Sequence, residues 1–416
     1  MEQRTNFRWK VFLLILTIGI ISYMDRVNLS VATPIIMQEF GMDKIDMGFL
    51  QTCFFTSYAL MQVPGGMLAE KFGPRKTGAV AVTWWSIFTA ATALGQGKMS
   101  FGIIRFLFGM GEGPIFPSVT LVNFKWFNPN EKGVASSAMT NGCFIGPIFG
   151  PAITVALMTT LGWHSVFILF GIVGLFLAIL WYKFVPADPK DSPYVNAAEL
   201  AYINEGRKAE SKDSSAPWSR FLSSTQFWAI GLQYLVADYI MYVFLSWLPM
   251  YLLEAYGFSL SKMGIWASFP WIALVAVNFF AGWLSDKVAM QSGDAQYKLR
   301  VITGIIGTII CSVGLYFASI TPDPTMNIIF MSISLGALGF CFNAGWASCI
   351  SLGGKFSASV GGWMNFWGNV GGVLAPLVTA FLVQAYGWSA ALNTTSMFGI
   401  IAIIAWLFVR PGKPLV

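Results

Sequence analysis

The feature that most constrains this chain is a series of long apolar runs that contain no charged residue. Four of them, at residues 47–69, 77–97, 263–285 and 301–322, are 21 to 23 residues long. A helix needs about 20 apolar residues to cross the hydrocarbon core of a bilayer. Charged residues make up only 11% of the sequence, against about 25% in soluble domains. The sequence therefore predicts an all-α integral membrane protein.

Two longer runs each divide into a pair of spans. Residues 133–182 break at Gly162 and residues 356–409 break at Gly387, and a tryptophan follows each glycine. The remaining spans are predicted at 11–38, 99–124, 221–253 and 324–354. The total is twelve transmembrane helices.

The segment between the sixth and seventh spans differs in composition from the rest of the chain. Residues 183–220 hold six basic and six acidic residues in 38 positions. We interpret this segment as a solvated linker. It divides the chain into an N-terminal six-helix bundle at 1–182 and a C-terminal six-helix bundle at 221–416.

The basic residues predict the orientation in the membrane. Twenty of them lie on the side shared by the two termini and the linker, whereas only Lys44, Lys98 and Lys262 lie on the other side. The positive-inside rule therefore predicts a multi-pass protein of the cell (inner) membrane with both termini and the linker in the cytoplasm. The net charge of +6 follows from this topology, so nucleic acid is not expected as a partner.

Other patterns argue against an enzyme or a metalloprotein. The five cysteines lie inside apolar stretches without the paired spacing of a zinc or redox site. No nucleotide-binding loop, no Ser-His constellation and no extramembrane domain beyond the linker is recognisable in the sequence. The N-terminal apolar run meets Met24-Asp25-Arg26 with no small-residue cleavage site, so we interpret it as an uncleaved first span. We expect no cofactor and no metal.

The two halves of the chain repeat one another. The sequence Gly-Gly-Met-Leu-Ala-Glu-Lys at 65–71 corresponds to Ala-Gly-Trp-Leu-Ser-Asp-Lys at 281–287. The Gly-Trp pairs divide the last hairpin of each half, and glycines precede a proline in spans five and eleven. Twin bundles of this kind predict a substrate site at their interface near the middle of the membrane, with transport by rocking of one bundle against the other.

Several motifs resemble those of a known transporter family. Residues 66–76 (GMLAEKFGPRK) resemble the signature loop of the major facilitator superfamily, with Glu70 where that pattern usually has Asp. Residues 22–28 (SYMDRVN), 62–66 (QVPGG), 105–117 (RFLFGMGEGPIFP) and 247–249 (WLP) resemble its anion:cation symporter family. The resemblance implies uptake of an organic anion, commonly a sugar acid in bacteria, coupled to protons. It also implies conformational gating by Gly66, Glu70, Arg75 and Asp286, and a monomer.

Five ionisable residues are predicted to lie within spans: Asp25, Arg26, Arg105, Glu112 and Asp238. Each costs about 2.5–3.5 kcal/mol at mid-membrane on insertion scales, and such residues mark functional sites by default. The set therefore predicts where the chemistry of transport takes place.

We predict different roles for the arginines and the carboxylates within the spans. Arg26 offers a planar, permanently charged fork that suits a carboxylate, so we expect it to bind the substrate. Arg105 and Glu112 lie seven residues apart, about 10.5 Å along one helix, so each needs a partner on another helix. Asp25 is a candidate partner for Arg105. Asp25 and Glu112 are the expected proton carriers, because His164, the only histidine, is expected at headgroup level.

Polar residues from both halves predict a site for hydroxyl groups. Asp238 is a third titrating group or a hydroxyl acceptor, and it leaves open a substrate that carries an amine. The neutral candidates for substrate binding are Tyr23, Tyr58, Asn141, Tyr242, Asn343, Trp346 and Asn365. Cys143 stands where related sugar-acid carriers commonly have Gln, which leaves the identity of the anion open.

The sequence thus favours a proton-driven importer of an organic anion, such as an aldonate, aldarate or hexuronate. Three alternatives remain open: an aromatic or short dicarboxylic acid as substrate, sodium as coupling ion, and proton-driven drug efflux. The last rests on Gly146-Pro147 and Gly150-Pro151, which partly resemble the signature of drug antiporters.

Overall fold

A computed structural model describes residues 3–206, 217–289 and 293–415 of the chain. Every regular element in these ranges is a helix. The described residues form two compact units. The first comprises residues 3–42 and 53–206, and the second comprises residues 43–52, 217–289 and 293–415.

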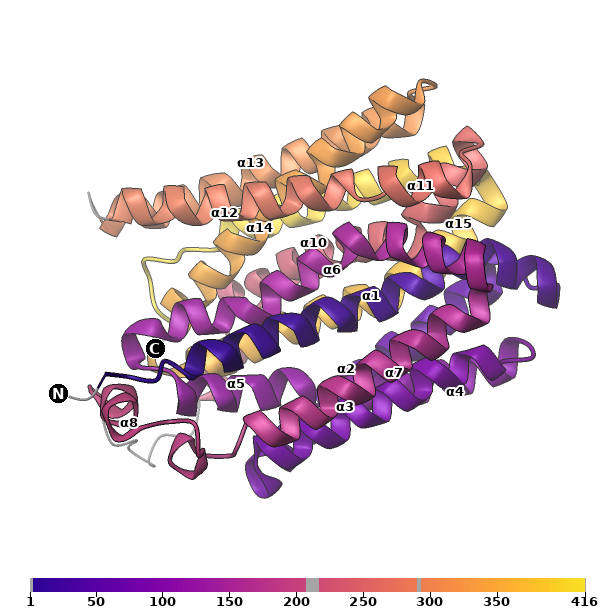
Figure 1. Cartoon of the computed structure of the whole chain (residues 1–416). Coiled ribbons are helices and arrows are strands. Elements are labelled where there is room, and N and C mark those ends of the chain that lie inside the picture. The colour runs from indigo at the N-terminus through magenta and orange to yellow at the C-terminus, as the bar shows by residue number, and fades with distance from the viewer. Residues whose placement is uncertain (1–2, 207–216, 290–292, 416) are drawn as a thin grey trace. The chain divides into compact units, whose positions relative to one another are not determined.

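The first unit is built from eight α-helices (Figure 1). Helix α1 packs against α6 and α7, and α3 packs against α4, α5 and α7. Their bounds are α1 Arg8–Phe40, α2 Lys44–Phe72, α3 Pro74–Ala91, α4 Lys98–Glu112, α5 Ile115–Trp126, α6 Lys132–Leu161, α7 Trp163–Phe184 and α8 Ala197–Asn204.

The second unit is built from seven α-helices and the start of α2. Helix α10 packs against α15 and α14, and α13 packs between α14 and α15. Within this unit Lys44, at the first position of α2, forms an ion pair with Glu254 of α10. The bounds are α9 Trp218–Leu222, α10 Thr225–Tyr256, α11 Leu260–Trp266, α12 Phe269–Ala289, α13 Gly293–Ile320, α14 Pro324–Gly353 and α15 Ser357–Phe408.

The helices confirm the predicted twelve-span architecture. Nine helical stretches of the described chain are long and apolar enough to cross a membrane. The last of them, Ser359–Phe408, contains two helices joined at Gly387, whose φ is 83°. Helix α2 and the α4–α5 pair supply the other two spans. The predicted span 99–124 is interrupted after Glu112, where Pro114 cannot donate a backbone hydrogen bond.

The internal repeat extends from sequence into side-chain contacts. In the first unit Trp163 Nε1 donates to Glu39 at 2.7 Å, and in the second Trp388 Nε1 donates to Glu254 at 2.8 Å. Each tryptophan follows a glycine with φ near 82°, a value that favours glycine because other residues clash there. The same hydrogen bond therefore joins the last membrane-spanning helix of each unit to the first long helix of that unit.

A second repeated contact sets how closely helices approach. A Cβ on Gly78 would lie 2.4 Å from Trp181, and a Cβ on Gly304 would lie 2.4 Å from Trp406. Both tryptophans are fully buried. Only glycine permits the large ring to lie against the backbone of the neighbouring helix. The two halves therefore pack in the same way at these positions.

Candidate functional site

Arg26 lies at the centre of a buried polar cluster in the first unit. It belongs to residues 22–33 of α1, every one of which is buried. Its Nε and Nη2 each lie 3.0 Å from Oε2 of Glu112, the last residue of α4. The side chains are 2% and 0% exposed. This ion pair joins α1 to α4 away from solvent, as expected from the need of Glu112 for a partner on another helix.

Three aromatic rings surround the Arg26 guanidinium. Its Cζ lies 4.4 Å from the ring centroid of Tyr23, 4.7 Å from that of Tyr58 and 4.9 Å from that of Phe54. A guanidinium within about 6 Å of a ring is attracted to the negative face of the π system. The rings therefore orient the fork of Arg26 in addition to the carboxylate that binds it. Phe54 was not among the predicted site residues.

Ser22 completes the environment of Glu112. Its hydroxyl donates a hydrogen bond to Oε1 of Glu112, while Arg26 occupies Oε2. Sequence reasoning missed Ser22, although a signal existed: it precedes Arg26 by four residues, so both side chains lie on one face of α1. Both oxygens of the carboxylate are therefore engaged by groups on α1.

Asp25 lies beside this cluster in a different environment. It is 1% exposed, and among the described residues neither carboxylate oxygen has a hydrogen-bond partner. The expected ion pair with Arg105 does not form, since the two side chains are not within 4.0 Å. The Cζ of Arg105 instead lies 4.5 Å from the ring of Phe108 and 4.9 Å from that of Phe54. Burial of a carboxylate without partners is costly as long as it stays charged.

Glycines of α6 bring it against the part of α1 that carries the cluster. A Cβ on Gly142 would lie 2.5 Å from the carbonyl oxygen of Leu16, and one on Gly146 would lie 2.6 Å from that of Ile20. The backbones therefore touch without intervening side chains. Of the predicted residues here, Asn141 is half-buried on the same helix, and Cys143 is buried beside it.

A second buried cluster lies in the second unit around Asp238. The side chain is 6% exposed on α10 and lies against α15, where a Cβ on Gly368 would be 2.1 Å from Oδ2. One turn before it, the Tyr234 hydroxyl accepts a hydrogen bond from Trp346 Nε1 at 3.0 Å. One turn after it, Tyr242 is buried. Three polar residues of α10 thus follow one face of the helix.

The remaining predicted binding residues of the second unit are half-buried on α14 and α15. The amide nitrogen of Asn343 lies 3.3 Å from the place of a Cβ on Gly282. The backbone carbonyl of Asn365 accepts a hydrogen bond from Asn369 Nδ2 at 2.9 Å. Within the described ranges, no group of three His, Cys, Asp or Glu side chains is placed to hold a metal ion.

The predicted gating residues separate into different environments. Arg75 donates from Nε to the Tyr182 carbonyl oxygen at 2.6 Å and lies over the ring of that residue. Glu70 is exposed near the end of α2, and Gly66 lies one helical turn before it. Asp286 belongs to α12, but its side chain lies outside the described residues.

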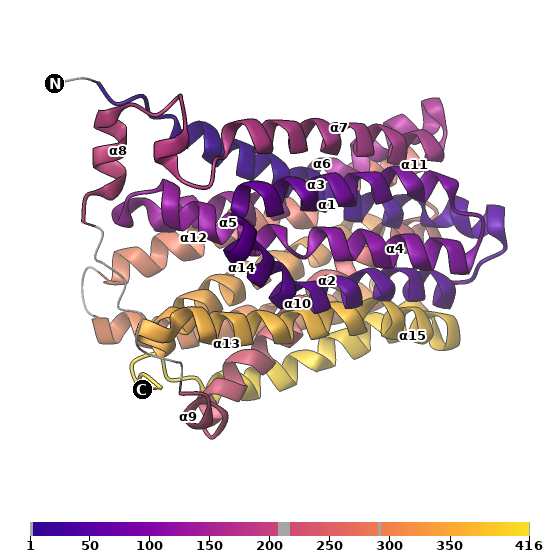
Figure 2. The ribbon, with the colours of Figure 1, turned by 90° about the horizontal axis from the view of Figure 1, so that it is seen from below.

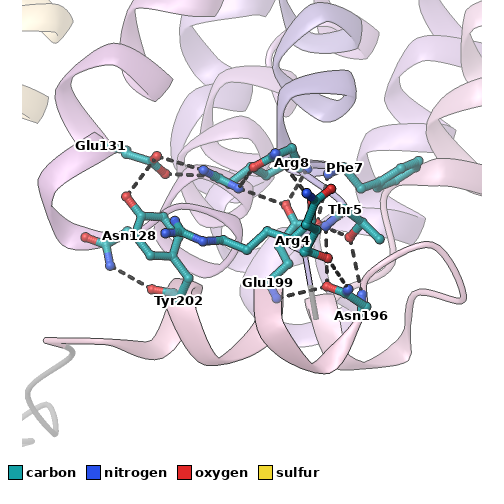
Figure 3. A network of polar contacts seen from close by, with 11 residues as sticks. Arg4, Thr5, Phe7, Arg8, Asn128, Glu131, Asn196, Glu199 and Tyr202 are labelled. Atoms are coloured by element: carbon teal, nitrogen blue, oxygen red, sulfur yellow. Dashed lines mark hydrogen bonds and ion pairs between the residues drawn. The ribbon is translucent and has the colours of Figure 1, made fainter. Parts of the chain in front are cut away.

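A polar network joins the predicted linker to the first unit, and sequence reasoning did not foresee it (Figure 3). Arg8, at the start of α1, binds both oxygens of Glu131 at 2.9 and 3.0 Å and binds Glu199 of α8 at 3.0 Å. Glu199 also accepts from the backbone N–H groups of Phe7 and Arg8 at 2.9 and 3.1 Å. Helix α8 therefore caps α1 with a carboxylate at its positive end.

The network also sets the acidity of Glu199, which lies outside the membrane-spanning helices. Burial by itself raises its pKa, but hydrogen bonds from the Thr5 hydroxyl, the two backbone N–H groups and the Arg8 guanidinium together lower the pKa below its usual value. The charged form of Glu199 is thus the form that holds α8 in place.

Comparisons with known proteins agree with this architecture. A family model described as the Major Facilitator Superfamily matches residues 15–376. The probable galactarate/D-glucarate transporter of Bacillus subtilis (strain 168) is 30% identical over 435 residues, which cover 100% of this chain and 94% of that protein. The hexuronate transporter of the same organism is 29% identical over 413 residues, which cover 97% and 96%.

Solved structures show the same fold at lower identity. A bacterial homolog of the human lysosomal transporter Spinster, crystallised in an inward-facing and unoccupied conformation, matches with a TM-score of 0.79. The match covers 97% of each chain at 17% sequence identity.

Proposed function

The chain belongs to the major facilitator superfamily, and from this premise we propose that it is a proton-coupled symporter that imports an organic anion. The proposed substrate class is sugar acids such as aldonates, aldarates or hexuronates, and the proposed mechanism is alternating access. The chain is thus a multi-pass membrane transporter rather than an enzyme. We further propose that both termini face the cytoplasm.

The ion pair between Arg26 and Glu112 is the observation that carries this proposal. The guanidinium is the group that suits a substrate carboxylate, yet Glu112 already occupies it. Protonation of Glu112 removes the negative charge that competes with the substrate. Proton binding and anion binding are therefore coupled through one guanidinium, because an anion and a charged Glu112 exclude one another there.

The net charge of the four ionisable residues within the spans of the first unit supports an anionic substrate. Asp25, Arg26, Arg105 and Glu112 cancel when all four are ionised. With both carboxylates protonated, the two arginines leave two positive charges, which suit a monovalent or divalent anion. Asp25 takes the second proton in this proposal, because a buried carboxylate without a hydrogen-bond partner gains by losing its charge.

Relatives and polar residues support the sugar-acid class. Both curated relatives named above are described as carriers of sugar acids, namely galactarate, D-glucarate and hexuronate. In the second unit, Asp238 and the Tyr234–Trp346 pair offer acceptors and a hydroxyl suited to substrate hydroxyl groups. Sugar acids carry several hydroxyls, whereas aromatic acids and short dicarboxylic acids carry few or none.

Purified protein in liposomes with an imposed inward proton gradient and no sodium tests this proposal. Internal pH is followed while galactarate, glucarate, galactonate, glucuronate, benzoate and a cationic dye are added in turn. We expect one sugar acid to acidify the interior, and Asp25→Asn and Glu112→Gln each to abolish that signal. If none of the anions acidifies the interior, or if uptake occurs only after sodium is added, proton symport is overturned. If protons move only when the cationic dye is present, proton-driven drug efflux replaces proton symport as the proposed function.

A further inference from the structure

Two apolar grooves run along the outer face of α3 in the first unit. The first, of about 450 Å³, lies between α3 and the helices α2 and α4, and the second, of about 740 Å³, lies between α3 and α7. Val80 and Trp84 line both grooves and form the ridge between them. Figure 2 shows α3 with α4 and α7 on either side. The two grooves thus lie on either side of one ridge.

Both grooves end in a lysine at the same end of the unit. Lys76, in the first turn of α3, lines the first groove, and Lys183, in the last turn of α7, lines the second. These helix ends are joined, because Trp181 Nε1 donates to the Pro74 carbonyl oxygen at 3.1 Å. Charge distribution predicts this end to be cytoplasmic.

Two further basic side chains lie next to residues that line the grooves. Arg75, the residue before Lys76, has its guanidinium 4.4 Å from the centroid of the Tyr182 ring, and Tyr182 lines the second groove. Lys71 lies over Phe72, which lines the first groove. The carboxylates closest in sequence, Glu70 and Asp188, line neither groove.

A comparable groove in the second unit lacks this feature. It has a volume of about 720 Å³, and its lining residues on α12, α13 and α14 include no charged side chain. Both units therefore have an exposed apolar groove, and of these three grooves in the described part of the chain only the two in the first unit have a basic end.

We propose that an anionic phospholipid binds this face, with one acyl chain in each groove and its phosphate between Lys76 and Lys183. The apolar walls suit acyl chains, and the basic end suits the phosphate. Basic pockets between transmembrane helices on the cytoplasmic side bind anionic head groups for this reason. The ridge of Val80 and Trp84 separates the two chains of one lipid.

Native mass spectrometry of the full chain in detergent, with equal amounts of dioleoyl phosphatidylglycerol and dioleoyl phosphatidylcholine, tests the proposal. We expect the wild type to retain about tenfold more phosphatidylglycerol than phosphatidylcholine. Lys76→Gln with Lys183→Gln should remove that preference. Lys10→Gln with Lys190→Gln removes the same charge from two exposed lysines that line neither groove, and it should preserve the preference.

Two further arms distinguish a bound phospholipid from a site for free phosphate esters. Val80→Trp enlarges the shared ridge at an exposed position, so it should reduce retention of both lipids without unfolding the protein. Excess glycerol 3-phosphate should not displace the lipid.

The proposal is overturned if the preference for phosphatidylglycerol survives in the double lysine variant. It is also overturned if glycerol 3-phosphate at equal concentration displaces the lipid. Both lysines are exposed, and the single variants provide the same readout should the double variant not fold.

Discussion

Both Nε and Nη2 of Arg26 lie 3.0 Å from the same oxygen of Glu112. The second oxygen of that carboxylate accepts from Ser22. The guanidinium is thus held at one edge by a single carboxylate oxygen and on its faces by aromatic rings. A substrate carboxylate that replaces Glu112 would find the fork already oriented, which reduces the entropy lost on binding.

Replacement of Arg26 by lysine should weaken substrate binding while it preserves the positive charge. An ammonium cannot present two parallel donors, and hydrogen bonds to charged groups contribute about 1.5–3 kcal/mol. We expect KM for the transported anion to rise by roughly 10- to 100-fold in liposome uptake. Arg220→Lys, an exposed arginine outside the transmembrane helices, is the matched control. An unchanged KM would remove Arg26 from the substrate site.

Loss of one member of the buried ion pair should destabilise the protein more than loss of both. Glu112→Leu leaves an uncompensated guanidinium and should cost about 3–5 kcal/mol, whereas Arg26→Met combined with Glu112→Leu should recover most of that loss. Thermal unfolding in detergent measures both. The partly exposed pair of Lys44 and Glu254 is the control, since Lys44→Met should cost at most about 1 kcal/mol. Equal costs at the two sites would contradict the buried-pair account.

The contact between Gly368 and Asp238 predicts a difference between two glycines of α15. Gly368→Ala places a Cβ 2.1 Å from Oδ2 of Asp238 and must displace that carboxylate, whereas Gly362→Ala meets no atom within 4 Å. We expect the first change to cost about 1–3 kcal/mol and to impair transport. The second should leave uptake unchanged and should raise stability by at most about 1 kcal/mol, because alanine is the better helix former. Equal uptake by the two variants would show that the position of Asp238 does not matter.

Acid should loosen the contact between α8 and α1. Because the pKa of Glu199 is lowered in the folded protein, the unfolded chain binds more protons between the two pKa values, and stability rises with pH there. The contribution is complete above the ordinary glutamate pKa of about 4.3 and is lost as the pH falls through the lowered folded value.

Thermal unfolding across this acidic range measures the effect. Glu199→Gln should lower the Tm at neutral pH, and its difference from the wild type should shrink as the pH falls. Glu205→Gln, on an exposed residue just after α8, should behave like the wild type. A difference that does not change with pH would mean that the charge of Glu199 is not what holds α8.

The sequence alone determined the class of protein, the number of spans and the duplication. These follow from run lengths, charge and repeated motifs, which need no knowledge of what lies opposite a residue. It also predicts that Arg26, Asp25, Glu112 and Asp238 take part in transport, because a charge inside an apolar span is costly wherever its partner is.

The tertiary structure decided which of these charges meet. It paired Glu112 with Arg26, turned Arg105 toward Phe108 and Phe54, and added Ser22 and Phe54 to the site. It also bound Glu199 to Arg8, 191 residues earlier in the chain. Such pairings depend on the rotation of each helix about its axis and on glycine contacts between backbones. The apolar pattern leaves that rotation open, since the spans are hydrophobic on nearly every face and only packing against neighbours selects one.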